Sequence, residues 1–218
     1  KCIYISSVST LGRKDGDLEI NEESFFSANK SVSNYAYSKY YAEQEVWRAS
    51  SEGINTIILN PSIILGPGDW NKGSSKIFQT VFNGLKFYSP GSSGYVDVMD
   101  VAKITIQFLS EKIKNERYIL NGTNISFQEV FNQIAVEFKI PRAKYKVTPF
   151  LKELAWRVDA LKTFFTGMPS LLTKETANSA MKSVAYSSKK IKETLKYDFI
   201  PIDKTIKEYC RFFEKELI

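Results

Sequence analysis

Two stretches, CIYISS (residues 2–7) and NTIILNPS (residues 55–62), decide the fold class. Each is an apolar, β-favouring run that ends in polar residues, as is typical of strands buried on both faces of a sheet. Residues 33–51 lie between them, contain no glycine or proline, and stop just before Gly53, which predicts a helix. A strand, a crossover helix and a second strand give parallel strands. The sequence therefore predicts an α/β protein with a parallel sheet.

The rest of the chain predicts two further short strands and mainly helices. Residues 61–75 are rich in glycine and proline and predict a loop. Ser126 and Glu129 form a capping box that starts a helix. The further strands are expected at 95–98 and 117–120, and the helices at 75–84, 100–114, 126–138, 149–165, 173–181, 188–195 and 201–217.

The amino-acid composition excludes several kinds of catalytic and metal-binding site. The 218 residues contain no histidine, which excludes Ser–His and Cys–His nucleophile pairs and HExxH metal sites. Cys2 and Cys210 are far apart, so we expect no metal site and a reduced, cytoplasmic setting. The net charge is +6, but no basic stripe with interleaved aromatics predicts nucleic-acid binding. Proton transfer must use a carboxylate, a tyrosine or a lysine.

The predicted helix at 33–51 carries a tyrosine–lysine pair. Tyr35 and Lys39 are four residues apart and share one helix face, whereas Tyr37 points about 160° away from Tyr35. An ammonium group beside a phenol favours the phenolate, so such a pair can transfer a proton without histidine. The alternative is that these side chains are only the aromatic face of a packed helix.

Polar residues follow both predicted strands. Ser6 and Ser7 end the first strand, and Asn60, Pro61 and Ser62 end the second. The carboxyl ends of parallel strands meet at one edge of a sheet, where open α/β sheets place their ligands. We therefore expect the serines, the proline and the tyrosine–lysine helix to converge on one crevice.

Four ordered motifs make the sequence recognisable. They are IYISSVSTLG (3–12), YAYSK (35–39), NPSIILGPGDW (60–70) and GYVDVMDVA (94–102). Together they resemble the extended short-chain dehydrogenase/reductase superfamily, the NAD-dependent epimerase/dehydratase family, and within it the dihydroflavonol-reductase-like bacterial members. The resemblance implies the C-terminal part of a Rossmann-type domain at 1–62, with 94–112 returning to it. It also implies a smaller, mainly helical substrate-binding region at 63–218.

The resemblance implies roles for the matched residues. Ser7 would hydrogen-bond the substrate oxygen, with Ser6 as the alternative if the register shifts by one residue. Tyr35 would pass the proton, and Lys39 would hold the nicotinamide ribose.

The same resemblance assigns further contacts with NAD or NADP. Pro61, Ser62 and Ile63 would line the nicotinamide. Ser74 or Ser75 would face the pyrophosphate at a helix start, unless these serines only cap that helix.

The family's glycine-rich phosphate loop has no match in this sequence. Its Gly-x-x-Gly-x-x-Gly spacing is absent, and Gly66 and Gly68 belong to a later turn. The buried strand at residues 2–5 also has no earlier strand to pair with, so we expect a longer parent protein. We predict that these 218 residues alone bind dinucleotide weakly or not at all and are inactive. The choice between NAD and NADP cannot be read from them.

At two positions the sequence differs from patterns found within the family, and these differences narrow the range of reactions that we expect. Dehydratases carry an Asp-Glu pair where Val8 and Ser9 follow Ser7, so dehydration is disfavoured. Nucleotide-sugar epimerases carry an arginine where residues 90–94 read PGSSG, although Arg142 or Lys144 could clamp a diphosphate. We therefore predict an NAD(P)-dependent oxidoreductase that acts on a small carbonyl or alcohol. The alternatives are a sugar or nucleotide-sugar epimerase and a non-catalytic dinucleotide sensor.

Two surface interactions complete the expectations. In the extended family, the tyrosine–lysine helix often lies in a dimer interface, which makes a homodimer through this helix a hypothesis. The apolar stripe after Pro149 is expected to be core or a wall of the substrate cleft, with Lys152, Arg157 and Lys162 near its apolar face. Peripheral contact with a membrane through that helix is the alternative.

Overall fold

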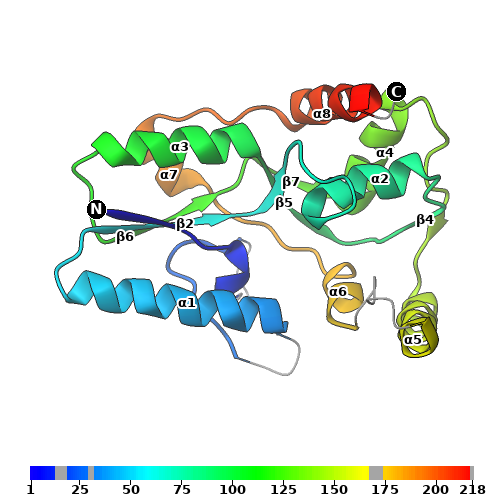
Figure 1. Cartoon of the computed structure of the whole chain (residues 1–218), viewed down its shortest axis with the longest axis horizontal. Helices are drawn as coiled ribbons and strands as arrows, with labels where there is room; N and C mark the ends of the chain where they lie inside the picture. The colour runs from blue at the N-terminus through cyan, green and yellow to red at the C-terminus, as the bar shows by residue number, and fades with distance from the viewer. Residues whose placement is uncertain (13–18, 29–31, 167–173, 217–218) are drawn as a thin grey trace.

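The computed structural model describes residues 1–12, 19–28, 32–166 and 174–216. A three-stranded parallel sheet contains β1 (Cys2–Ile5), β2 (Thr56–Pro61) and β6 (Glu116–Leu120), with β2 in the centre. Helix α1 (Asn34–Ser51) covers one face and α3 (Val98–Ser110) the other (Figure 1). The α/β class and the parallel sheet predicted from the sequence are confirmed.

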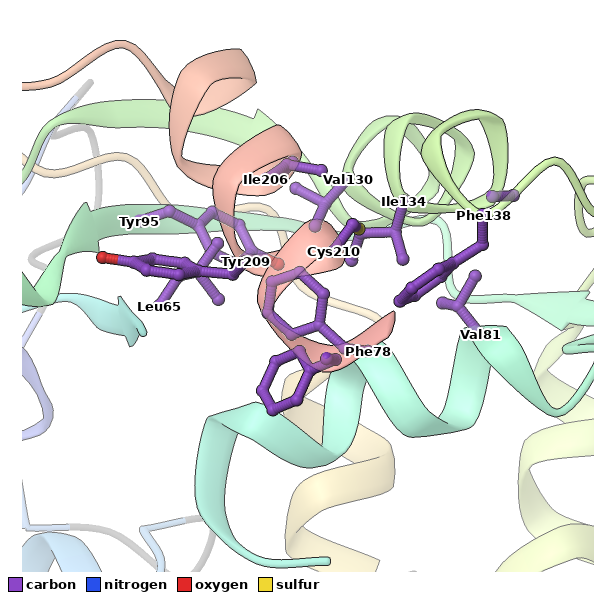
Figure 2. Packing of buried hydrophobic residues seen from close by; sticks show 12 residues of the cluster. Leu65, Phe78, Val81, Tyr95, Val130, Ile134, Phe138, Ile206, Tyr209 and Cys210 are labelled. Atoms are coloured by element: carbon purple, nitrogen blue, oxygen red, sulfur yellow. The ribbon is translucent and has the colours of Figure 1, made fainter. Parts of the chain in front are cut away.

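A second sheet follows directly from the first. The chain leaves β2 and enters β3 (Ile63–Leu65), which pairs in parallel with β5 (Ser92–Asp97). Strand β5 also pairs antiparallel with β7 (Thr123–Ser126). Side chains from this sheet and three helices form a common core (Figure 2). The helices are α2 (Lys76–Phe82), α4 (Phe127–Glu137) and α8 (Ile202–Glu216).

The remaining elements are short or lie at the periphery. Strands β4 (Phe87–Tyr88) and β8 (Tyr145–Lys146) form a parallel pair. Helices α5 (Pro149–Thr166) and α6 (Lys174–Ser179) contact each other away from the first sheet (Figure 1). Helix α7 (Lys189–Leu195) packs against β6. Two 3-10 turns, η1 (Val8–Thr10) and η2 (Gly73–Ser75), complete the described chain.

Helix ends follow local capping chemistry. Ser33 caps α1 by accepting a hydrogen bond from the Ala36 amide, and Gly53 follows the helix with φ of 99°. The Ser126 hydroxyl accepts from the Glu129 amide, which confirms the predicted cap of α4. Helix α3 begins two residues before the predicted position, because the Asp97 carboxylate accepts from the Met99 amide at 2.7 Å. The expected start at residue 100 is therefore wrong.

Strand β3 lies in the stretch predicted to be a loop, and β7, like the two-residue strands β4 and β8, is not predicted from the sequence. Strand β3 has three residues between Ser62 and a glycine-rich turn, and β7 has four residues. Neither is long enough to show the alternation that predicts a strand. Both are stabilised by pairing with β5, which is distant in sequence. Such strands exist only because tertiary contacts complete their hydrogen bonds.

Candidate active site

The carboxyl ends of the three parallel strands form the edge at which the predicted residues gather. Strand β1 pairs with β2 up to Ile5 and Leu59, and the Ser6 amide donates to the Leu59 carbonyl at 2.7 Å. Strand β2 pairs with β6 up to Pro61 and Leu120. The register therefore brings the serines after β1 beside the end of β2, as the sequence predicts.

The two serines differ in what their hydroxyls are free to do. Ser6 is buried and donates to the Glu43 carboxylate at 2.6 Å, so its proton is already used. Ser7 is half-buried and accepts from the Ser9 amide at 3.1 Å. Within the described residues, no hydrogen bond takes the Ser7 hydroxyl proton. Ser7 can therefore donate to a ligand oxygen, whereas Ser6 has a structural partner.

Tyr35 and Lys39 lie one helical turn apart at the start of α1. The Tyr35 side chain is 56% exposed. The Lys39 ammonium donates to the Ile5 carbonyl at 3.2 Å and lies 5.6 Å from the centre of the Tyr4 ring. Burial raises the pKa of the Tyr4 phenol, and the neighbouring Glu43 and Tyr35 add to that rise. Lys39 is thereby held at the carboxyl end of β1, the strand that leads into Ser7.

A buried polar cluster that sequence reasoning missed ties these elements together. Glu43 is fully buried on α1, one turn after Lys39. Its Oε2 accepts from Ser6, from the Thr10 hydroxyl at 2.9 Å and from Asn60 Nδ2 at 3.0 Å. Its Oε1 forms an ion pair with Arg117 of β6. The carboxylate thus links the helix to all three parallel strands.

Asn60 connects this cluster to the backbone of Ser7, one of the candidate catalytic residues. Its Nδ2 also donates to the Ser7 carbonyl at 2.9 Å, which fixes the backbone of the turn after β1. One signal in the sequence could have revealed the cluster. Residues 36, 40, 43 and 47 have the spacing of one helix face, so Glu43 is an acid in the stripe that faces the sheet. A charged residue at such a position needs a buried partner.

The residues at the end of β2 and directly after it have two different environments. Pro61 and Ser62 are buried, and the Ser62 amide donates to the Leu120 carbonyl at 3.0 Å. Ile63 starts β3 and packs against the core of the second sheet. Ser62 and Ile63 therefore stand where the chain crosses from one sheet to the other.

Ser74 and Ser75 hold the connection that follows β3. The Ser74 hydroxyl donates to the Ile64 carbonyl, and the Ser75 hydroxyl donates to the Gly66 carbonyl at 3.2 Å. Neither side chain caps α2. The alternative that these serines serve as side-chain caps is therefore wrong. Their hydroxyls hold the connection between β3 and α2 in place.

A pocket of about 510 Å³ borders the buried cluster on its outer side. Thr10 and Arg117 line it together with Tyr40 and Trp47, and the Arg117 guanidinium stacks 5.6 Å from the Trp47 ring. Ser7, Tyr35 and Lys39 are not among its lining residues. This pocket is therefore separate from Ser7, Tyr35 and Lys39, which lie near the carboxyl end of β1.

The chain is similar in sequence and in fold to known proteins. The chain is 28% identical over 203 residues to the protein named "Putative dihydroflavonol 4-reductase" of Synechocystis sp., which covers 88% of this chain and 58% of the relative. It is 31% identical over 159 residues to cinnamoyl-CoA reductase 2 of Arabidopsis thaliana, covering 64% of this chain and 48% of that protein. The crystal structure of gox2253 superposes with a TM-score of 0.78 at 27% identity, covering 98% of this chain and 66% of the other.

These relatives are longer than the chain, which spans about half to two thirds of their length. The NAD dependent epimerase/dehydratase family matches residues 1–120. This segment contains all three strands of the parallel sheet, the tyrosine–lysine helix and α3. The chain therefore belongs to the NAD-dependent epimerase/dehydratase family.

Proposed function

We propose that the protein is an NAD(P)-dependent oxidoreductase that reduces a carbonyl or oxidises an alcohol on a small molecule. One observation carries the proposal. Lys39 is anchored to the last residue of β1, so the helix that bears Tyr35 starts beside the turn that bears Ser7. A proton donor or acceptor, a cation and a hydroxyl with an unused proton then lie at one sheet edge.

The proposed roles follow from the groups that remain available. Ser7 donates a hydrogen bond to the substrate oxygen, because its proton is unused within the described chain. Tyr35 exchanges a proton with that oxygen, and its exposure leaves the phenol accessible. Lys39 keeps two further N–H groups beyond its bond to Ile5 for the ribose hydroxyls.

The cofactor would supply or accept the hydride when it is bound. We propose that Pro61, Ser62 and Ile63 line the nicotinamide, since they leave β2 at the edge that carries Ser7. Ser6 and Ser75 support this site indirectly, because their hydroxyls are bonded to Glu43 and Gly66. We expect the substrate to be less charged than a nucleotide sugar, because residues 90–94 lack the arginine that nucleotide-sugar epimerases carry there.

Replacing Tyr35 tests the proposal. In the natural protein, supplied with NADH or NADPH and a panel of aldehydes and ketones, Tyr35→Phe should lower kcat by about a hundredfold or more, since a positioned acid or base contributes that much. Cofactor binding should change little. Tyr37→Phe is the matched control, because Tyr37 packs on Phe26 and Tyr41 instead of facing Lys39.

The alternatives give different results in the same assay. A tightly bound cofactor that is never consumed, with interconversion of a sugar epimer, would indicate an epimerase. Binding without turnover of any substrate would indicate a sensor. Full activity in Tyr35→Phe would show that the proton-transfer assignment is wrong.

A further inference from the structure

An exposed surface at the far end from β1 combines aromatic, aliphatic and basic side chains. We call it the basic aromatic surface. The side chains of its apolar members are exposed by 47% to 76%. It comprises Lys86, Phe87, Arg142, Lys144, Tyr145, Lys146, Phe150 and Leu154.

The surface is built on the β4–β8 pair and continues into α5. Phe87 pairs with Tyr145 across the two strands, and their ring centroids lie 5.5 Å apart. Both the Lys144 and the Tyr145 amides donate to the Lys86 carbonyl, which fixes the register. Because side chains alternate along a strand, Phe87 and Tyr145 form an aromatic pair on one face of these strands, and Lys146 projects from the other face.

Helix α5 adds an apolar face to this pair only two residues after β8. Phe150 and Leu154 are four residues apart on one side of the helix, exposed by 76% and 49%. Lys152, by contrast, donates to Oδ1 of Asn178 in α6 at 2.6 Å. The helix is thus docked through one side, while the Phe150 side is left to solvent.

Almost all of the net charge of the chain lies in this region. Residues 139–157 contain six basic residues and one acidic residue, a net charge of +5, while the whole chain has +6. The single acid, Glu153, is paired with Lys152 and Arg157. In the described structure, no ion pair engages Arg142, Lys144 or Lys146. Their charge is therefore available to a partner.

We propose that the basic aromatic surface docks on an anionic lipid bilayer. No helix in the described parts of the chain is long and apolar enough to cross a membrane, so the contact would be peripheral. A bilayer offers negative headgroups to the lysines and an apolar boundary to Phe150 and Leu154 at the same time. A nucleic acid offers phosphates and stacking bases, but it has no continuous apolar layer that takes up Phe150 and Leu154 together. The proposal does not depend on the catalytic assignment.

Vesicle co-sedimentation of the 218-residue chain tests the docking. Binding is expected to phosphatidylcholine vesicles that contain phosphatidylglycerol and not to pure phosphatidylcholine vesicles. It should weaken as salt rises, because exposed charges are screened. Each lysine near an anionic surface contributes about fivefold in affinity, so the double variant Lys144→Glu/Lys146→Glu should lose roughly twentyfold or more. Phe150→Ser should lose about tenfold, because its ring no longer enters the apolar boundary.

Matched controls separate the surface from general charge and hydrophobicity. Lys204→Glu/Lys207→Glu makes the same charge change on exposed positions of α8. Ile106→Ser removes a side chain that is 66% exposed on α3. Both controls should keep full binding, and circular dichroism should show that all variants are folded.

Three outcomes would overturn the proposal. The first is no binding to phosphatidylglycerol vesicles at low salt. The second is an equal loss in the α8 control, which would assign binding to net charge alone. The third is unchanged vesicle binding in Phe150→Ser together with equally strong binding to a single-stranded RNA, which would identify a polyanion site.

Discussion

At the scale of single residues, Glu43 links the elements that carry the candidate catalytic residues. It is fully buried, yet it accepts three hydrogen bonds and pairs with Arg117. A buried carboxylate is tolerated only when partners replace its lost hydration. The same partners fix Asn60 and, through it, the Ser7 carbonyl. The backbone position of Ser7 therefore depends on a buried carboxylate of α1.

Glu43→Gln should destabilise the protein strongly. The change leaves the largely buried Arg117 guanidinium without its counter-charge, and breaking a buried ion pair typically costs about 3 kcal/mol or more. Urea unfolding should show this as a large fall in the transition midpoint. Glu45→Gln is the control, because Glu45 and Arg48 form an ion pair that is more than 60% exposed on both sides, and such pairs contribute less than about 1 kcal/mol. Equal losses of unfolding free energy in the two variants would show that the Glu43–Arg117 ion pair contributes no more to stability than an exposed ion pair.

At the scale of elements, Asp97 connects the two halves of the fold. It caps α3 through the Met99 amide and also accepts from the Thr205 and Tyr209 hydroxyls of α8 at 2.7 and 2.8 Å. Burial raises the pKa of Tyr209, and its hydrogen bond to Asp97 adds to the rise. One carboxylate thus starts the helix on the first sheet and holds the C-terminal helix on the second.

Asp97→Ala should cost more than loss of an ordinary helix cap. A cap contributes about 1 kcal/mol, and each buried hydroxyl left without a partner adds about 1 to 3 kcal/mol. We expect a total of about 3 kcal/mol or more in thermal or urea unfolding. Ser126→Ala is the matched comparison, because Ser126 caps α4 and has no such buried partners in the described contacts. A loss near 1 kcal/mol for both would mean that α8 does not depend on Asp97.

At the scale of the whole molecule, β1 forms one margin of the first sheet. The strand order is β1-β2-β6, and no described strand pairs with the other side of β1. Parallel strands are usually covered on both sides and faces. Helix α3, which packs on this sheet, also exposes Ile106 and Leu109 by 66% and 63%. Among the described strands, β1 therefore carries an unpaired edge of the first sheet.

These residues alone should bind a dinucleotide weakly or not at all. No glycine-rich phosphate loop is present in the sequence, so backbone amides for the pyrophosphate are missing. A fluorescence titration of the 218-residue chain with NADH and NADPH tests this, with Lys39→Ala as the comparison. Affinity in the micromolar range that is lost in Lys39→Ala would overturn the prediction and show that the chain holds a complete site.

Much of the fold could be predicted because its signals are local. The apolar runs of β1 and β2, the glycine-free helix between them and the capping box at Ser126 each act over a few residues. The four-residue spacing of Tyr35 and Lys39 likewise follows from helix geometry alone. Strands β3 and β7 and the early start of α3 escaped prediction, because each depends on a partner distant in sequence or on a single cap.

The sequence by itself determined the α/β class, the tyrosine–lysine pair and the family resemblance, since periodicity and motif order are properties of neighbouring residues. Only the tertiary structure decided that the Ser6 hydroxyl donates to the Glu43 carboxylate, whereas the Ser7 hydroxyl proton has no acceptor among the described residues. It also revealed that Glu43, Asn60 and Arg117 form one buried cluster. The physical reason is that a hydrogen bond or ion pair between residues up to 74 positions apart exists only after the chain has folded and excluded water from both partners.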